Sequence, residues 1–288
     1  MFFKYPRSLL LCLLPIVVLV SGCKTELEKG LDEYKVATSN YLEEQSSESR
    51  LAVIESGTNL NTVYSNEANR LLSLMFRGSE LKSIRSSTEV VNVKLIESVP
   101  STKDWDLLKF LTSNNPYISY SDFSFRRFSD EVFAKVAQQL VLDEEWDALL
   151  ILGAPYRTYS HDSLTYLVKN YHGKDPYLLT LKGIGLHELG NYHAAFNVFQ
   201  SAALLDRKYS MWPVAMARHF GCEDLESIWI EFVSDPSRIN QYTRFFSGGT
   251  YPSFGSTLTK DQIFQYRSDI KGGKLAPIFK GCLPRGNG

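Results

Sequence analysis

The stretch DPYLLTLKGIGLHELGNYHAAFNVFQSAALLDRKY, residues 175–209, decides the fold of this chain. Asp175 followed by Pro176 is typical of a helix start, because the carboxylate accepts hydrogen bonds from free backbone N–H groups and proline fits the first turn. The segment LGNY, residues 189–192, interrupts the apolar pattern with a glycine and an asparagine. We therefore expect two helices joined by a very short turn, and helices joined in this way pack as an antiparallel hairpin.

The same stretch resembles a tetratricopeptide repeat, a two-helix unit of about 34 residues. Gly183 stands where the first helix of that repeat needs a small residue for close helix contact, and residues 189–192 match its turn. The small, large and small residues of its second helix are matched by Ala195, Phe199 and Ala202. The stretch departs from the family pattern at Leu179, where tryptophan is usual, and at Arg207, where proline is usual. The alternative interpretation is a generic amphipathic hairpin.

Neighbouring segments extend this interpretation along the chain. A single repeat cannot bury both of its faces, so the resemblance requires hairpins of similar shape on either side. Residues 129–153 resemble a degenerate repeat, and the segment after residue 209 resembles a truncated one that turns at Gly221. We predict an all-α fold in which antiparallel helical hairpins stack as a tetratricopeptide-like solenoid over residues 60–235. Its clearest repeat covers residues 176–209.

Capping residues and apolar spacing predict the other helices. Expected helix starts follow Ser65, Ser101, Ser129, Ser160 and Thr259, and expected ends fall at Gly78, Gly153 and Gly173. The segment EVVNVKLI, residues 89–96, mixes strand-like alternation with helical spacing, and we assign it to a helix. Residues 236–288 are predicted to form a loop-rich C-terminal extension with one helix, which Thr259 caps and Gln262 completes as a capping box.

The beginning of the chain resembles a bacterial lipoprotein signal peptide. A positively charged segment is followed by an apolar run over residues 9–20, and Ser21 and Gly22 then precede Cys23. The run is shorter than the about 20 residues that a spanning helix needs. In this family the lipobox cysteine is acylated and becomes the first residue of the mature protein. The resemblance implies a signal peptide over residues 1–22 and lipidation of Cys23, with a plain signal peptide or an uncleaved anchor as alternatives.

The residues after Cys23 bear on location. In the lipoprotein family, aspartate after the lipobox cysteine tends to hold the protein at the inner membrane, and this chain has Lys24 there. The resemblance therefore implies an outer-membrane protein that is anchored by lipid and faces the periplasm, with the inner membrane or the cell surface as alternatives. Residues 23–59 are largely polar and are predicted to be the lipidated N-terminus and a tether or loosely ordered helix.

The remaining cysteines fit an oxidising compartment. Cys12 leaves with the signal peptide and Cys23 carries lipid, which leaves Cys222 and Cys282 as an even pair. We predict a disulfide between them, since the C-terminal tail otherwise has little to hold it. The alternative is two unpaired thiols. No CxxC motif and no cluster of cysteine and histidine indicates a metal site.

Chemical motifs are weak throughout the sequence. The net charge is −1 and no basic run stands out, which argues against nucleic-acid binding. The residues Ser160, His161 and Asp162 have the types of a catalytic triad, but neighbours in sequence cannot adopt its geometry, and helix capping explains them better. His187 and His193 flank a turn and do not share a helical face, so they do not indicate a metal site. We expect no catalytic residue, no metal and no cofactor.

A recognition surface is the remaining candidate site. In tetratricopeptide proteins the first helices of successive repeats line a groove that holds a peptide or a partner's helix. By matched position, the resemblance places Tyr177, Thr180, Ile184, His187 and Glu188 on that face. Their mixture of aromatic, aliphatic and polar groups suits peptide binding. The alternative is that Tyr177 and Ile184 pack against the preceding hairpin.

Two functions from different classes are consistent with these features. The first is a non-enzymatic, lipid-anchored periplasmic scaffold whose helical repeats bind a protein of an envelope assembly, pilus or secretion system. The second is an enzyme acting on cell-wall glycan, or its accessory lipoprotein. That enzyme requires two carboxylates about 5 to 9.5 Å apart in a cleft. The sequence contains many acidic residues but no pattern that pairs two of them.

Overall fold

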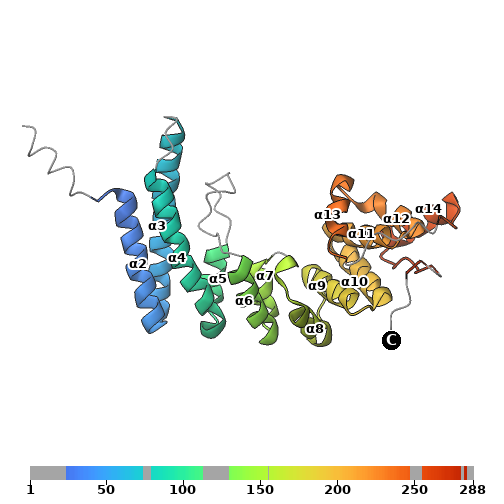
Figure 1. Ribbon diagram of the computed structural model, residues 1–288, viewed down its shortest axis with the longest axis horizontal. Helices are drawn as coiled ribbons and strands as arrows, with labels where there is room; N and C mark the ends of the chain where they lie inside the picture. Colours follow the sequence, from blue (N-terminus) through green and yellow to red (C-terminus); the bar gives the residue numbers. More distant parts are fainter. Residues whose placement is uncertain are drawn as a thin grey trace, which may run out of the picture. The chain divides into compact units, whose positions relative to one another are not determined.

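The computed structural model describes residues 24–73, 79–112, 130–154, 156–246, 255–279 and 282–283. Every regular element in these ranges is a helix, so the predicted all-α class is confirmed for the described part of the chain (Figure 1). The chain divides into two compact units, Met1–Phe128 and Ser129–Gly288. Each unit has its own helical packing, and the two are described separately.

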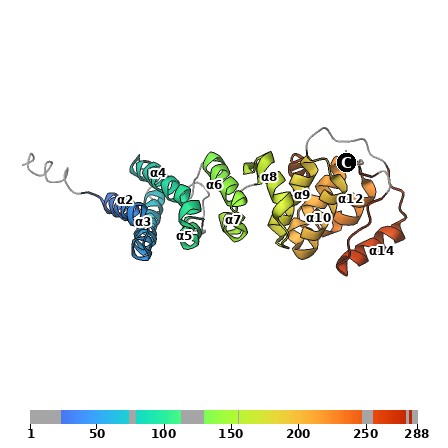
Figure 2. The same cartoon turned by 90° about the horizontal axis from the view of Figure 1, so that it is seen from below.

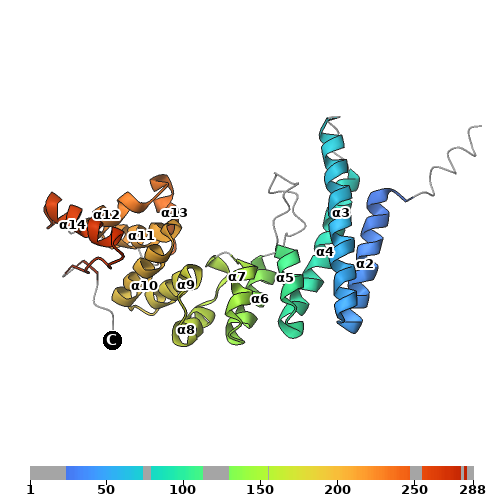
Figure 3. The same ribbon diagram turned by 180° about the vertical axis from the view of Figure 1, so that it is seen from behind.

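The residues that the structure describes in the first unit form four helices. They are α2 (Glu26–Glu44), α3 (Ser47–Ser73), α4 (Ser79–Thr102) and α5 (Trp105–Thr112). Helix α2 packs against both α3 and α4, and α5 packs against α3 and α4. Figure 3 shows α2 and α3 side by side, joined by a turn in which Gln45 adopts a left-handed conformation with φ of 49°.

A buried tyrosine and a glycine bring these helices close together. The hydroxyl of Tyr34 in α2 donates to Oδ1 of Asn92 in α4 at 2.7 Å, and both residues are buried. Gly57 in α3 faces the same ring, because a Cβ atom added there would lie 2.9 Å from Cε2 of Tyr34. The glycine therefore permits the close approach of α3, and the hydrogen bond satisfies the one polar atom of a tyrosine in an apolar core.

The prediction of a polar tether over residues 23–59 was wrong for the residues that the structure describes there. Thr25 caps α2 with a complete capping box, and Glu28 is its partner. One face of α2 is buried at helical spacing by Leu27, Gly30, Leu31, Tyr34, Ala37, Thr38 and Tyr41. The many charged residues between them occupy the opposite face. The segment is polar on average but amphipathic, so it packs as a helix.

Other helix boundaries in this unit also differ from the predictions. Residues 89–96 are helical, as predicted, within α4. The expected start at Ser65 was wrong, because α3 runs through it and the Ser65 hydroxyl donates to the carbonyl of Asn61 inside the helix at 2.8 Å. The expected start after Ser101 was also wrong: Asp104 caps α5 by accepting from the Leu107 N–H at 3.0 Å. Gly78 and Ser129 lie outside the described residues.

The second unit contains more and shorter helices. They are α6 (Asp130–Leu142), α7 (Trp146–Leu152), α8 (His161–Asn170), α9 (Pro176–Glu188), α10 (Tyr192–Leu205), α11 (Met211–His219), α12 (Glu223–Trp229), α13 (Ile239–Thr243) and α14 (Lys260–Lys271). Short 3₁₀ turns lie between them at Tyr156–Thr158, Arg207–Ser210, Ile230–Phe232 and Pro236–Arg238. Consecutive helices pack against one another, most extensively α9 with α10 and then α8 with α9 and α11 with α12.

The hairpin of α9 and α10 has the predicted start, turn and contact. Asp175 accepts from the N–H groups of Tyr177 at 2.8 Å and Leu178 at 3.2 Å, which caps α9. Gly190 closes the turn with a φ of 75°, a conformation that glycine adopts without steric cost. A Cβ atom added to Gly183 would lie 2.5 Å from Cε1 of Phe199, so the glycine is what lets the two helices pack this closely.

The C-terminal extension is folded onto the last hairpin. Thr259 and Gln262 form the predicted capping box at the start of α14, and α14 packs beside α12 (Figure 2). Asp224 in α12 binds the segment that precedes α14. Its carboxylate accepts from the Thr257 N–H at 3.0 Å and from the Thr257 hydroxyl at 2.7 Å. It also accepts from the Ser256 hydroxyl at 2.5 Å.

A second clamp holds the chain after α14. The side chain of Gln200 in α10 accepts from the Ala276 N–H at 2.9 Å and donates to the Ala276 carbonyl at 3.1 Å. Trp229 in α12 donates its indole N–H to the same Gln200 oxygen at 3.1 Å. Gln200 and Trp229 are both fully buried. One amide side chain therefore satisfies both backbone groups of a residue distant in sequence and fixes the extended segment against two helices.

Candidate functional site

The five residues predicted to line a partner groove do not form one. Thr180, Ile184 and His187 are buried, with exposed fractions of 0%, 4% and 3%. The prediction that they face an open groove was therefore wrong. Thr180 donates its hydroxyl to the Pro176 carbonyl one turn earlier in α9, at 2.8 Å, so it has no free polar group to offer a ligand.

Tyr177 packs against the preceding hairpin, as the alternative interpretation predicted. Its hydroxyl donates to the Ala154 carbonyl at 2.6 Å and lies 2.8 Å from the hydroxyl of Tyr159. Its ring lies 5.3 Å from the ring of Tyr156. Burial raises the pKa of the Tyr177 hydroxyl well above its ordinary value. Tyr177 is half-buried, and its neutral hydroxyl donates a hydrogen bond within the second unit.

Glu188 is the one exposed residue of the predicted five. It ends α9, and its Oε2 lies 3.0 Å from Nδ1 of His161 at the start of α8. This contact joins α8 and α9 at their ends and engages the carboxylate. An ion pair at an exposed position contributes little to stability, at most about 1 kcal/mol.

Aromatic residues from a later part of the chain pack against His187 and against Phe199 of the same hairpin. Phe246, which follows α13, lies 4.8 Å from the ring of His187 and 5.9 Å from that of Phe199, measured between centroids. Trp212 in α11 stacks on Phe199 at 5.4 Å and meets Phe245 at 5.1 Å. The sequence contained the signal for this packing, three aromatic residues within residues 242–246, but nothing in it indicated which residues they would contact.

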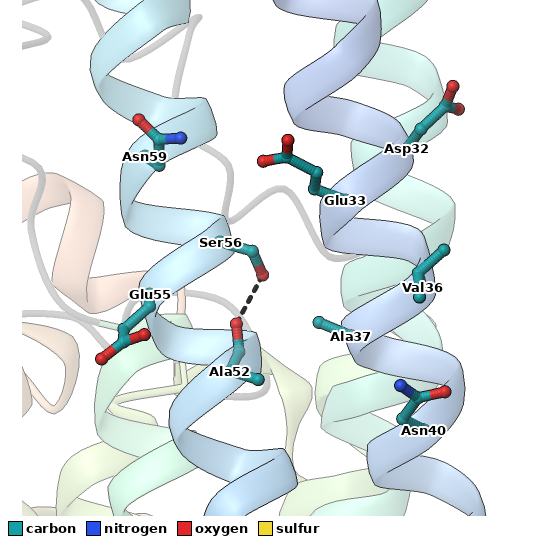
Figure 4. Close-up of a pocket in the computed structure, with 9 residues that line it drawn as sticks. All are labelled: Asp32, Glu33, Val36, Ala37, Asn40, Ala52, Glu55, Ser56 and Asn59. Atoms are coloured by element: carbon teal, nitrogen blue, oxygen red, sulfur yellow. Dashed lines mark hydrogen bonds between the residues drawn. The ribbon is translucent and has the colours of Figure 1, made fainter.

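An open groove lies instead in the first unit, between α2 and α3. It has a volume of about 700 Å³ and is lined by Asp32, Glu33, Val36, Ala37, Asn40, Ala52, Glu55, Ser56 and Asn59. In Figure 4, Glu33 and Ala37 of α2 and Ser56 of α3 point toward one another across the gap. The Ser56 hydroxyl donates back to the Ala52 carbonyl at 2.6 Å. The sequence analysis missed this groove because it assigned its walls to a tether.

The floor and the rim of the groove differ in chemistry. Small apolar side chains, Ala37 and Ala52, lie between the helices, and Val36 remains 60% exposed. Three carboxylates line the groove, and neither lysine nor arginine is among its lining residues. Asp32 pairs with Lys24, whose ammonium group holds the pKa of that carboxyl below its usual range. Within the described ranges, Glu33 and Glu55 have no ion-pair partner.

This arrangement suits recognition better than acid–base chemistry. A general acid needs a pKa raised toward neutrality, which burial in an apolar pocket provides. Glu33 and Glu55 are exposed, and the pKa of Asp32 is lowered by the Lys24 hydrogen bond. No group of three histidine, cysteine, aspartate or glutamate side chains that could hold a metal ion lies in the described part of the chain.

The four cysteines divide into two groups. Cys12 and the predicted lipidation site, Cys23, lie outside the described residues. Cys222 and Cys282 are joined in the structure, and their Cα atoms lie 5.1 Å apart, within the usual range for a disulfide. Both side chains are buried. The pair fastens the C-terminal segment at Cys282 to the turn between α11 and α12.

The described helices contain none that is long and apolar enough to span a membrane. Comparison with protein-family models, with curated proteins and with solved structures found no match to this chain.

Proposed function

We propose that this protein is a lipid-anchored periplasmic scaffold that binds a protein partner of an envelope assembly, pilus or secretion system. The observation that carries the proposal is the open groove between α2 and α3. It combines a narrow apolar floor with three carboxylates, and it lies on two helices of 19 and 27 residues. Long helical walls of this kind suit a helix or an extended segment of another protein.

The position of the groove relative to Cys23 supports the anchored form of this proposal. Helix α2 begins at Glu26, three residues after Cys23. Three residues span at most about 10 Å, so an acyl chain on Cys23 would hold the start of α2 at the membrane surface. Two or three acyl chains give stable anchoring where one does not. Confinement of the groove to the membrane plane would raise its effective concentration for a membrane-bound partner. Anchoring at the outer membrane, facing the periplasm, is part of the proposal.

The chemistry of the groove indicates which partner fits. Glu33 and Glu55 present negative charge, and the residues that line the groove include neither lysine nor arginine. Val36, Ala37 and Ala52 offer a shallow apolar strip that accepts short side chains. The complementary partner is an amphipathic helix that carries lysine or arginine beside small apolar residues. Charge complementarity of this kind fixes register and speeds association more than it increases affinity.

The hairpins of the second unit support the helical-repeat part of the proposal. The contact of Gly183 with Phe199 and the turn at Gly190 have the features that a tetratricopeptide-like repeat requires. The hairpin of α11 and α12 follows with its turn at Gly221, where φ is 68°. We propose that these hairpins stack as a tetratricopeptide-like array. Since the face of α9 is covered, this array would serve as a rigid support and the partner would bind at the first unit.

The experiment is affinity capture of the full-length protein from membranes, followed by identification of co-purified proteins. A double substitution, Glu33→Lys with Glu55→Lys, should remove a specific partner that the unmodified protein recovers. The matched control is Glu43→Lys with Glu44→Lys, which reverses two exposed carboxylates of α2 outside the groove and should leave recovery unchanged. Cys23→Ser should move the protein out of the membrane fraction. Equal recovery by the groove variant and the control would contradict the proposed site.

A further inference from the structure

Helix α4 carries a stripe of exposed residues along its outer side. Lys82, Ser86, Val90 and Lys94 recur at every fourth position, so they lie along one side of the helix. All four are exposed, and the exposed fraction of Val90 is 59%. The stripe ends where Glu97, which is also exposed, follows Lys94 by three positions. These four residues, the α4 stripe, place two ammonium groups on either side of a small hydroxyl and an exposed apolar side chain.

The charges of the α4 stripe are not used within the described part of the first unit. Lys82 and Lys94 form no ion pair with any residue described there. Single exposed apolar residues are ordinary on protein surfaces, so Val90 alone would indicate no partner. A lysine on either side of it makes a pattern that one kind of surface matches, an apolar strip bordered by carboxylates.

The groove between α2 and α3 is a surface of that kind. Glu33 and Glu55 line it with negative charge, and its lining residues include no lysine or arginine. Val36 stands exposed beside the small side chains of the floor, Ala37 and Ala52. Figure 4 shows Glu33 and Ala37 directed into the gap between the two helices. The α4 stripe complements this groove in both respects, with ammonium groups for its carboxylates and a valine for its apolar floor.

The two surfaces also match in length. The groove follows α2 from Asp32 to Asn40, which is about 12 Å at the rise of an α-helix. The stripe runs from Lys82 to Lys94, which is about 18 Å by the same measure. When the middle of the stripe lies on the floor, both lysines therefore lie just beyond the ends of the groove. Lysine stems are long and flexible, so their ammonium groups can reach back to the carboxylates.

Helix α4 cannot place this stripe in the groove of its own chain. Asn92 faces α2, where its Oδ1 accepts from the Tyr34 hydroxyl at 2.7 Å. Val90 precedes Asn92 by two positions, which places it about 200° around the helix axis. The helix thus holds α2 with one side and presents Val90 on the other. The stripe can enter only the groove of another copy.

We propose that the α4 stripe docks in the α2–α3 groove of a second copy of this chain. The inference rests on the docking role that the proposed function gives to the groove, and it names the occupant. The groove and the stripe are different surfaces of the same unit, so the copies associate head to tail. Each copy that fills a groove still offers its own, and such contacts continue into a closed ring or an open filament.

The experiment is cysteine crosslinking of the full chain in membranes of cells that produce it. The variant carries Val36→Cys in the groove and Val90→Cys in the stripe. A disulfide requires Cα atoms roughly 4.4 to 6.8 Å apart, so oxidation joins only surfaces in close contact. We expect a ladder of dimers, trimers and larger species on a non-reducing gel. Mass spectrometry of the digested ladder should identify the bond between positions 36 and 90.

Three controls test the geometry of the contact. Val36→Cys alone and Val90→Cys alone should give no ladder, because a head-to-tail contact never brings two copies of one position together. Ser39→Cys combined with Val90→Cys should also give none. Ser39 is an exposed residue of α2 that does not line the groove, and its substitution changes neither charge nor size appreciably.

Charge reversal tests the complementarity in the same crosslinking variant. Glu33→Lys with Glu55→Lys should reduce the ladder about tenfold or more, because lysines then face lysines across the contact. Lys82→Glu with Lys94→Glu should do the same through facing carboxylates. All four reversals together restore opposite charges and should restore the ladder. A merely structural role of these residues would not produce this rescue.

The outcomes separate this inference from the proposed function. It is overturned if the paired cysteines give no ladder, if either single cysteine crosslinks as strongly as the pair, or if the fourfold reversal does not restore the ladder. If the fourfold variant does not fold, the ladder of the cysteine pair decides. A missing ladder, with a different protein still captured through Glu33 and Glu55, would overturn the inference and leave the proposed function standing. A ladder without any other groove-dependent protein would do the reverse.

Discussion

The ring of Phe199 in α10 packs directly against the backbone of Gly183 in α9. A Cβ atom at position 183 would lie 2.5 Å from Cε1 and 2.8 Å from Cδ1 of that ring. Phe199 is fully buried and also stacks on Trp212 of the next hairpin, at 5.4 Å between centroids and an interplanar angle of 10°. One side chain thus connects the packing within a hairpin to the packing between hairpins.

Gly183→Ala should lower the stability of the second unit, because the new methyl group overlaps a ring that Trp212 prevents from moving away. Overpacking of this kind costs about 1 to 3 kcal/mol, which exceeds the about 1 kcal/mol gained from replacing a glycine inside a helix. Urea unfolding followed by tryptophan fluorescence measures the change, since three of the four tryptophans belong to this unit.

The double variant Gly183→Ala with Phe199→Leu is the control for this prediction. A leucine leaves room for the methyl group, so the two changes together should cost less than the sum of their separate effects. Strict additivity of the two free-energy changes would show that the contact between the residues is not what makes Gly183 necessary.

Local signals in the sequence predicted the hairpins correctly. Asp175, Gly190, and Thr259 with Gln262 all act as predicted, because capping and turn formation depend on residues a few positions apart. The buried contact of Gly183 was also predictable, since the repeat pattern specifies a small residue there. These features need no knowledge of distant parts of the chain.

Long-range packing accounts for the predictions that failed. Thr180, Ile184 and His187 were assigned to a surface but are buried, and the ring that packs on His187 is Phe246, more than 50 positions later in the chain. The tether was a different kind of error, because the charged face of α2 dominated its average composition while Tyr34 and its companions were buried on the other face. The groove between α2 and α3 could not be predicted once that helix had been missed.

Gln200→Leu should release the extended segment around Ala276. The change removes both hydrogen bonds to Ala276 and the partner of the Trp229 indole N–H, and all of these groups are buried. Unsatisfied buried donors and acceptors cost about 1 to 3 kcal/mol each, so we expect a loss of several kcal/mol at most and faster hydrogen exchange at residues 274–279.

Hydrogen exchange in α9 is the control for this prediction. It shows whether Gln200 holds only the C-terminal segment or supports the core as a whole. Protection of α9 should change little in Gln200→Leu, because Gln200 bonds to the C-terminal segment and α12. Loss of protection in α9 equal to that at residues 274–279 would contradict the assignment of Gln200 as a clamp.

Asp224 should make the stability of the second unit depend on pH. Burial alone would raise the pKa of this carboxyl, but hydrogen bonds from Ser256, Thr257 and Leu258 outweigh it and hold the pKa below 3.8. Since the folded pKa is depressed, the stabilisation is complete above the unfolded value and is lost as the pH falls through the folded one.

Asp224→Asn should therefore destabilise the protein at pH 7, by about 1 to 3 kcal/mol for the lost charge-assisted bonds. As the pH falls below 3.8 the difference between the variant and the unmodified protein should shrink, because the Asp224 carboxylate becomes neutral as the pH passes through its lowered pKa. Urea unfolding at a series of pH values checks this convergence. Asp235→Asn is the control, since Asp235 is exposed and bonds only within its own turn. A difference that did not shrink as the pH fell below 3.8 would contradict this account of Asp224.

The pairing of Cys222 with Cys282 should be the main covalent support of the C-terminal segment. The bond closes a loop with a sequence separation of 60 residues, for which the chain-entropy model gives about 4 kcal/mol. Cys282→Ser should lower stability by up to that amount and increase exchange at residues 274–279, and a reducing agent should have the same effect on the unmodified protein. The Cys282→Ser variant should then show no further response to the reducing agent. Mass spectrometry after alkylation without reduction checks the pairing itself, since labelling of both Cys222 and Cys282 would show two free thiols and contradict the prediction.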